Sequence, residues 1–190
     1  MIIVNKKYDV LRTVPGYEGA ADLNAVKEDA KNVTVGILGL GARKVDIAKF
    51  KDCTFAEIDN LLKDLAREIR KNWERGRERT FVFIYYAGHG ELEGLTFAVL
   101  NDVKKRRFPI EMFLRNLGTN EGAYVVAILD CCRSKCTPAI KRGKDDEGDV
   151  LGDLDESGVY RNTFVTFGCP PYSGVDERST IAVMYFAKLK

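Results

Sequence analysis

Two segments of the sequence end in residues that can do acid–base and nucleophilic chemistry. His89, the only histidine among the 190 residues, follows the apolar run FVFIYYAG. Asp130, Cys131 and Cys132 follow a second apolar run, YVVAIL. Both runs predict buried strands, and ligands usually bind where the strands of a parallel sheet end. Because a cysteine nucleophile requires a base such as imidazole beside the thiol, the two segments predict a catalytic site.

The two adjacent cysteines are not equivalent on a strand. Side chains alternate along a strand, so Asp130 and Cys132 share one face while Cys131 points to the other. This alternation favours Cys132 as the nucleophile and places Cys131 in the core. The alternative is that both thiols are buried as small hydrophobic side chains, the usual state of free cysteine. His89 favours the catalytic interpretation, because it supplies the base that a reactive thiol requires.

The composition is that of one globular domain spanning residues 1–190. It has 45% hydrophobic and 31% charged residues, which is ordinary for a soluble protein. The net charge of +2 argues against a nucleic-acid or membrane-surface partner. Five cysteines without a CxxC pair favour a reducing compartment, and no apolar stretch approaches membrane-spanning length. The N-terminus has no signal-peptide pattern, so the expected location is the cytoplasm.

Strand-like and helix-like segments alternate along the chain. Thr54 and Glu57 form a capping-box pattern before a long amphipathic helix, and Pro109 opens a shorter one. Such alternation predicts an α/β fold, a three-layer αβα sandwich in which helices cover both faces of a mostly parallel sheet. The polar, glycine-containing segment 135–158 is expected to be an exposed loop. The expected strands lie at 2–4, 43–50, 80–86, 95–99, 124–129 and 162–167, and further helices at 21–37 and 180–189.

Two other patterns do not support a cofactor or metal site. Gly39 and Gly41 begin a dinucleotide-loop pattern, but Lys44 stands at the third glycine position and a helix precedes the pattern. These glycines instead predict the end of a helix. Cys136 lies close to the two adjacent cysteines, yet the spacing matches no structural zinc motif. The residues therefore indicate no metal ligand and no required cofactor.

The motifs YYAGHG and LDCCRS, in this order, resemble those of the caspase-like cysteine peptidases, most of all the metacaspase and paracaspase branches. The similarity covers nearly the whole chain. It implies a sheet of about six strands between helices and a catalytic dyad of His89 and Cys132. It also implies an oxyanion hole formed by the backbone N–H groups of Gly90 and Cys132, donors that stabilise the tetrahedral intermediate. The implied substrates are peptides or proteins, cleaved through a thioester acyl-enzyme.

Asp130 stands two residues before the expected nucleophile, where true caspases carry glutamine in a Q-A-C-R-G motif. In the metacaspases and paracaspases the matching acid helps to bind a basic P1 side chain. Asp22 and Asp176 resemble further acids of that S1 pocket, although a helix N-cap is an equal interpretation of Asp22. Carboxylates that face a guanidinium form charge-assisted, bidentate hydrogen bonds, which favours arginine over lysine at P1.

In this family the connection after the nucleophile strand is often cut during maturation. The segment 135–158 carries basic residues, and exposed, poorly packed segments are cleaved most readily. The resemblance therefore suggests autocleavage after Lys141, Arg142 or Lys144, and the alternative is an inert surface loop. The resemblance is also compatible with calcium activation and with a homodimer.

A second functional class is a caspase-like scaffold that is weak or inactive as an enzyme and acts through partner binding or dimerisation. The chain ends at Lys190, where the family usually has another strand and pocket-forming loops, and it starts inside the first strand. The expectation is therefore either an excised catalytic domain or a protein with an incomplete pocket. His89, Cys132 and the glycines beside His89 favour the active enzyme.

Overall fold

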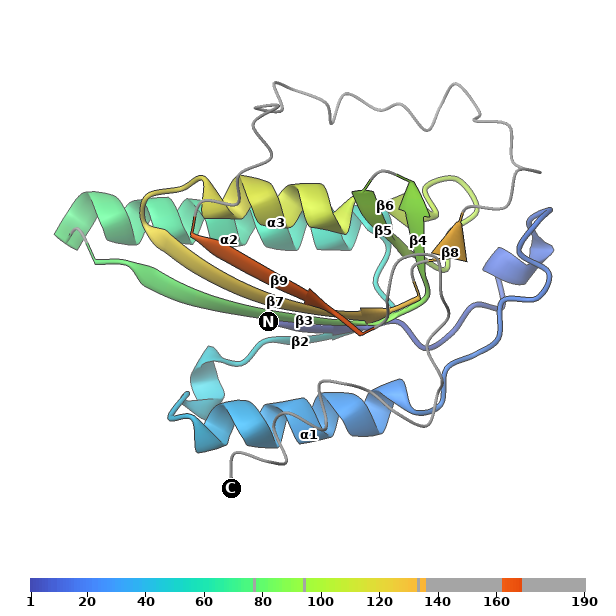
Figure 1. Cartoon of the computed structure of the whole chain (residues 1–190), viewed down its shortest axis with the longest axis horizontal. Helices are drawn as coiled ribbons and strands as arrows, with labels where there is room; N and C mark the ends of the chain where they lie inside the picture. The colour runs from blue at the N-terminus through green and yellow to red at the C-terminus, as the bar shows by residue number, and fades with distance from the viewer. Residues whose placement is uncertain (77, 94, 133, 136–161, 169–190) are drawn as a thin grey trace.

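A parallel sheet forms the centre of the computed structural model, which describes residues 1–76, 78–93, 95–132, 134–135 and 162–168. The strands of this sheet are β1 (Ile2–Val4), β2 (Lys49–Lys51), β3 (Thr80–Gly88), β7 (Ala123–Cys131) and β9 (Thr163–Phe167). Within the described residues these five strands lie in the order β2-β1-β3-β7-β9, and all neighbouring strands are parallel (Figure 1). The predicted α/β class with a mostly parallel sheet is confirmed.

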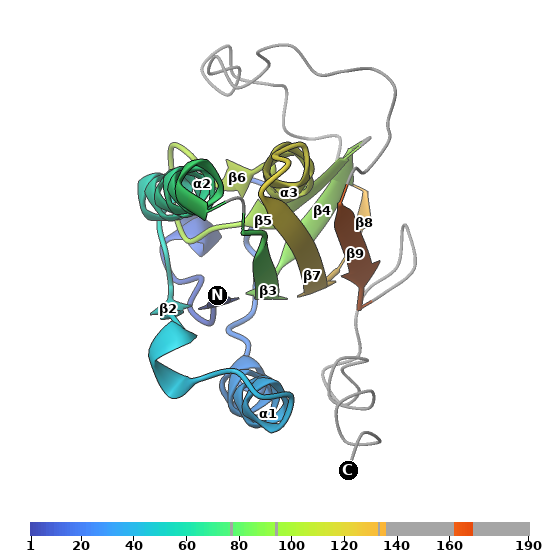
Figure 2. The same cartoon turned by 90° about the vertical axis from the view of Figure 1, so that its left-hand side faces the viewer.

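Helices cover both faces of the sheet, as the predicted three-layer sandwich requires. Helix α1 (Val26–Gly39) lies on one face, and α2 (Phe55–Gly76) and α3 (Ile110–Gly118) lie on the other (Figure 2). The alternation of side chains along β3 explains these layers. Ile84 belongs to the apolar core that α2 and α3 contribute to, whereas Tyr85 packs in a second cluster with Val26 and Val33 of α1.

The predicted capping box begins α2. The backbone N–H of Thr54 donates to a carboxylate oxygen of Glu57 at 2.8 Å, and the N–H of Glu57 donates to Oγ1 of Thr54 at 3.4 Å. This reciprocal pair satisfies two of the backbone donors that the N-terminus of a helix leaves without partners. The prediction of a long helix after Thr54 is therefore confirmed.

Helix α1 begins at Val26 and not at residue 21, where the sequence predicts its start. The reason lies in the preceding segment, because the N–H of Leu23 donates to the carbonyl of Lys6 at 3.0 Å. This bond holds the chain against the segment that follows β1 and keeps it out of a helix. At its other end α1 stops at Gly39, as the glycine pattern predicts.

The predicted strand 43–50 is wrong over its first half. Residues Lys44–Asp46 form a 3-10 turn, and only the short β2 follows as a strand. The guanidinium of Arg43 donates to the carboxylate of Asp46 at 2.8 Å and 2.9 Å, which closes the turn. A second 3-10 turn spans Leu11–Thr13.

A smaller sheet begins where β3 and β7 end (Figure 1). It consists of β4 (Gly90–Glu93), β5 (Leu95–Val99), β6 (Arg107–Phe108) and β8 (Ser134–Lys135), in the order β6-β5-β4-β8. Only β5 coincides with a predicted strand. The others lack a long apolar run, because β4 contains two glutamates and β6 and β8 have two residues each. The parallel pairing of β4 with β8 continues the pairing of β3 with β7 beyond the C-terminal edge of the main sheet.

Several predictions concern residues that the structure does not describe. The predicted helix 180–189, Asp176, and the residues Lys141, Arg142 and Lys144 of the expected processing loop all lie outside the described ranges. Among the residues that are described, no helix is long and apolar enough to cross a membrane.

Candidate active site

His89 and Cys132 lie at equivalent points of two neighbouring strands. Gly88 at the end of β3 pairs with Cys131 at the end of β7, so His89 and Cys132 are the next residues on each strand. Beyond them the chain pairs again, with Glu91 of β4 opposite Ser134 of β8. The two sheets therefore bring the imidazole and the thiol, which are far apart in the sequence, to one edge.

One pocket contains both side chains. It is bounded by the strand ends on one side and by the start of α1, with the segment that precedes it, on the other. Among the residues that line it are the two acids Asp29 and Asp130 together with His89 and Cys132. A thiol, an imidazole and two carboxyl groups thus line the same pocket.

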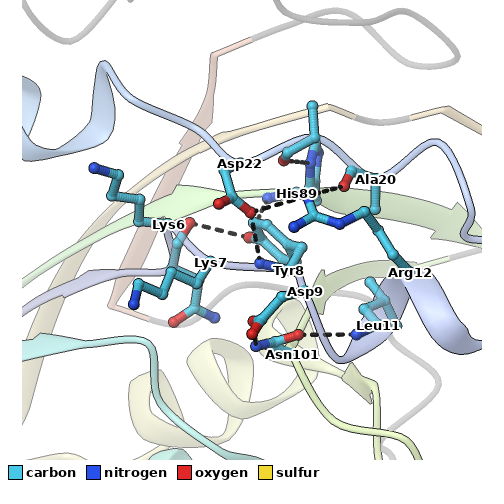
Figure 3. Close-up of polar contacts among 12 residues, drawn as sticks. Lys6, Lys7, Tyr8, Asp9, Leu11, Arg12, Ala20, Asp22, His89 and Asn101 are labelled. Atoms are coloured by element: carbon cyan, nitrogen blue, oxygen red, sulfur yellow. Dashed lines mark hydrogen bonds and ion pairs between the residues drawn. The ribbon is translucent and has the colours of Figure 1, made fainter.

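The imidazole of His89 is held by a backbone carbonyl. Its Nε2 lies 2.8 Å from the carbonyl oxygen of Ala21, in the segment before α1. A carbonyl oxygen only accepts hydrogen bonds, so this contact places the proton of the neutral ring on Nε2. Nδ1 is then the nitrogen that can accept a proton from the thiol. The ring of Tyr8 packs against the imidazole, with ring centroids 4.4 Å apart (Figure 3).

The two cysteines occupy different environments, as the strand alternation predicts. Cys131 is only 1% exposed and belongs to the main apolar core. Cys132 is partly exposed at the pocket. This difference makes Cys132 the thiol that a substrate can reach, and the predicted burial of Cys131 is confirmed.

The backbone of Gly90 lies directly against that of Cys132. A Cβ added at Gly90 would lie 2.5 Å from the carbonyl oxygen of Cys132 and 2.7 Å from Sγ of Cys131. No side chain fits at this contact, because two of the neighbouring atoms belong to a packed strand end. The two residues expected to supply oxyanion-hole N–H groups are therefore adjacent in space.

Asp130 is buried, and one of its two carboxylate oxygens has a hydrogen-bond partner among the described residues. Its Oδ2 accepts a hydrogen bond from the hydroxyl of Tyr85 at 2.8 Å, while Oδ1 has no hydrogen-bond partner among the described residues. A Cβ added at Gly168 would lie 2.5 Å from that Oδ1, so the glycine leaves this oxygen room. Burial raises the pKa of Asp130 to about 6, with a further increase from the charge of Asp29 and an opposing effect of the Tyr85 bond.

Asp29 is a pocket residue that the sequence reasoning missed. It lies in the first turn of α1 and is 9% exposed. A signal for it exists in the sequence, since Asp29 stands three residues after Val26 and four before Val33. Those two residues belong to the apolar stripe of the helix, so an acid between them lies on the buried face. A charge on the buried face of an amphipathic helix indicates a functional or paired group.

Asp22 does not line the pocket, and it does not cap a helix. Its Oδ1 accepts from the backbone N–H of Tyr8 at 3.0 Å and from the guanidinium of Arg12 at 3.1 Å (Figure 3). The N-cap residue of α1 is Ala25, without a side-chain cap. The N-cap interpretation of Asp22 is therefore wrong. Its role in the S1 pocket stays a prediction, and the carboxylate is paired here with the loop after β1. These contacts hold Asp22 in place, and the carbonyl of the preceding residue, Ala21, contacts His89.

Among the described residues no group of three or more histidine, cysteine, aspartate or glutamate side chains could hold a metal ion. The pocket chemistry that these residues can perform is acid–base and nucleophilic.

The sequence of the chain was also compared with known families. The family model of the caspase domain matches residues 1–184. A comparison with curated proteins found no match. The matched range contains every element described above, including the strand ends that carry His89 and Cys132.

Proposed function

Since the chain belongs to the caspase domain family, a family of cysteine peptidases, we propose that it is a cysteine endopeptidase that cleaves after basic P1 residues. The observation that supports this most directly is the composition of one pocket. His89 and Cys132 share it with the two acids Asp29 and Asp130. The first pair can break a peptide bond, and the second pair can bind a cation next to that bond.

The dyad would act in two steps. Nδ1 of His89 accepts the proton of the Cys132 thiol, and the thiolate attacks the scissile carbonyl carbon. The oxygen of the tetrahedral intermediate then accepts hydrogen bonds from the backbone N–H groups of Gly90 and Cys132. His89 gives its proton to the leaving amine as the C–N bond breaks and a thioester forms. Water, deprotonated by His89, attacks the thioester and releases the second product, and the proton returns to the thiolate.

The two acids support a preference for basic P1 side chains. Asp130 and Asp29 are both buried, and the negative charge of Asp29 disfavours ionisation of Asp130. A guanidinium or ammonium group in the pocket removes this repulsion and neutralises buried charge. Arginine is favoured over lysine because its planar group can bond both oxygens of a carboxylate. This preference would place the protein with the metacaspases and paracaspases within the family.

A fluorogenic peptide screen tests the proposal. Matched substrates with arginine, lysine or aspartate at P1 are assayed with and without calcium, beside Cys132→Ala. We expect hydrolysis after arginine, less after lysine, and none in the variant. Cleavage after aspartate alone would overturn the basic preference. Activity that persists in Cys132→Ala would overturn the assigned nucleophile, and no hydrolysis under any condition would favour a non-enzymatic scaffold.

A further inference from the structure

The consecutive tyrosines Tyr85 and Tyr86 of β3 point to opposite faces of the sheet and reach different parts of the site. Both are fully buried. Tyr86 belongs to the core shared with α2 and α3, and Tyr85 to the cluster shared with α1. A buried phenol hydroxyl needs a hydrogen-bond partner. The hydroxyl of Tyr86 bonds to His89 and that of Tyr85 to Asp130, two residues of the proposed active site.

Tyr86 and Tyr8 together hold the backbone of His89. The hydroxyl of Tyr86 donates to the carbonyl oxygen of His89 at 2.9 Å. The hydroxyl of Tyr8 donates to the carbonyl of Asn5 at 3.1 Å and accepts the N–H of His89 at 2.8 Å. Both polar backbone atoms of His89 are therefore bound by buried phenols.

The chain before His89 passes close to both hydroxyls, and the carbonyl of His89 also accepts the N–H of Val99 at 2.9 Å. A Cβ added at Gly88 would lie 2.5 Å from the hydroxyl oxygen of Tyr86 and 2.8 Å from that of Tyr8. The loop thus passes against both phenols, and the contact of Nε2 with Ala21 then fixes the ring itself. With backbone and ring both held, the direction of Nδ1 is set before substrate binds, which is what an ordered proton transfer requires.

Tyr85 holds the other half of the site. Its hydroxyl donates to Oδ2 of Asp130 at 2.8 Å, and this bond sets the rotation of the carboxylate. Oδ1 keeps its acceptor capacity, since no described residue bonds to it. A hydroxyl donor to a carboxylate also favours the ionised form, which is the form that binds a cation.

We propose that Tyr85 and Tyr86 are positioning residues with separate tasks, Tyr86 with Tyr8 orienting the imidazole of His89 and Tyr85 orienting the carboxylate of Asp130. The assignment rests on the proposed peptidase function. Neither tyrosine touches the reacting atoms. Strand β3 therefore supports bond cleavage through Tyr86 on one face and P1 recognition through Tyr85 on the other.

Phenylalanine substitutions test this division, because they retain the ring and remove only the hydroxyl. Tyr86→Phe should lower kcat for an arginine substrate about tenfold with KM nearly unchanged, since a misdirected base slows the chemistry. Tyr85→Phe should raise KM for the arginine substrate about fivefold or more, the scale of one lost hydrogen bond, with little change in kcat. Tyr124→Phe is the matched control, because Tyr124 is half exposed at the start of β7 and its hydroxyl is bonded to Arg79.

Two readouts do not depend on peptide hydrolysis. The rate of Cys132 alkylation by iodoacetamide, measured across pH, reports the thiolate that His89 creates. It should fall near neutral pH in Tyr86→Phe and match the wild type in Tyr85→Phe and Tyr124→Phe. The carboxyl NMR titration of Asp130 should move to higher pH in Tyr85→Phe alone, because the hydroxyl that favours its ionised form is gone.

These readouts separate the failure of this inference from a failure of the proposed function. If the wild type cleaves no peptide, the alkylation and NMR results still decide the two positions. Unchanged alkylation in Tyr86→Phe, an unchanged Asp130 titration in Tyr85→Phe, or equal kcat and KM effects in both variants would overturn the inference. Should Tyr86→Phe fail to fold, Tyr8→Phe removes the acceptor on the other side of His89 and must show the same slowed alkylation.

Discussion

The side chains of Asp29 and Asp130 line one pocket although they come from α1 and β7, two elements on different layers. The charge of Asp29 contributes to the raised pKa of Asp130, and burial contributes more. A like charge near a buried acid disfavours ionisation of that acid. Ionisation of Asp130 therefore has an electrostatic cost, which the proposed basic P1 side chain would remove.

The first prediction is that this cost appears as a pH dependence of stability. The pKa of Asp130 is raised from 3.8 to about 6, so in this window the folded protein binds more protons than the unfolded chain. The free energy of unfolding must then fall as pH rises through the window, by roughly 3 kcal/mol in all. Asp130→Asn removes the titrating group and should flatten this part of the profile. Urea unfolding of both proteins from pH 4 to pH 7 measures it.

The outcome at pH 7 gives the sharpest check of this prediction. Asp130→Asn should be more stable than the wild type there, because it lacks a buried charge, and the two should converge near pH 4. A variant that is less stable than the wild type at pH 7 contradicts the raised pKa.

The second prediction concerns which acids select the P1 residue. Asp29→Asn and Asp130→Asn should each lower kcat/KM for arginine substrates by about 10- to 100-fold, the scale of one charge-assisted bond. Asp22→Asn retains an acceptor for Tyr8 and lies outside the pocket, so it should keep the preference for arginine over aspartate. Matched substrates differing only at P1 provide the measurement. A larger loss of that preference in Asp22→Asn than in Asp29→Asn would restore the assignment based on the sequence.

The third prediction concerns the dyad. Cys132→Ala and His89→Ala should abolish hydrolysis with the thermal unfolding midpoint nearly unchanged, because neither side chain belongs to the apolar core. Cys131→Ala should retain activity at some loss of stability, since it removes a buried sulfur from the packed core. Iodoacetamide labelling followed by mass spectrometry should find Cys132 modified first. Preferential labelling of Cys131 would reverse the assignment of the nucleophile.

The fourth prediction uses the close approach at Gly90. In Gly90→Ala the new Cβ would meet the backbone oxygen of Cys132 at 2.5 Å, and a packed strand end cannot yield without cost. We expect destabilisation of about 1–3 kcal/mol and loss of most activity, as the two oxyanion donors move apart. Gly39→Ala is the control, because its added Cβ meets nothing within 4 Å apart from its chain neighbours and the nearby backbone of its own helix. Wild-type activity and stability in Gly90→Ala would show that the contact is not close in solution.

The fifth prediction concerns self-processing, and it rests on the pocket chemistry and the sequence alone. If the acids select basic P1 residues, the segment 135–158 contains suitable sites at Lys141, Arg142 and Lys144. Wild-type protein should then accumulate two fragments cut after one of these residues, and Cys132→Ala should stay intact. Mass spectrometry of the two proteins after identical incubation decides between them. Equal nicking in both, or none in the wild type, would mean that the segment is not a self-processing site.

The sequence alone predicted the layers of this protein and the two strand ends that His89 and Cys132 follow. Apolar runs of strand length alternate along the chain with segments whose apolar residues recur about every 3.6 residues. Both patterns reflect local backbone geometry and depend on few distant contacts. The capping box at Thr54 is local in the same sense. Strand alternation separated Cys132 from Cys131 because the period of two is a property of the backbone.

Only the tertiary structure decided which groups surround His89 and Cys132. Asp22 precedes α1, and Asp29 lies in its first turn. Packing of α1 against the sheet brings Asp29 into the pocket, whereas Asp22 forms an ion pair with Arg12. The carbonyl of Ala21 that holds His89, and the phenols that hold His89 and Asp130, carry no local pattern. Such contacts join residues from separate elements, so they exist only once the sheet order and the helix placement have put those elements side by side.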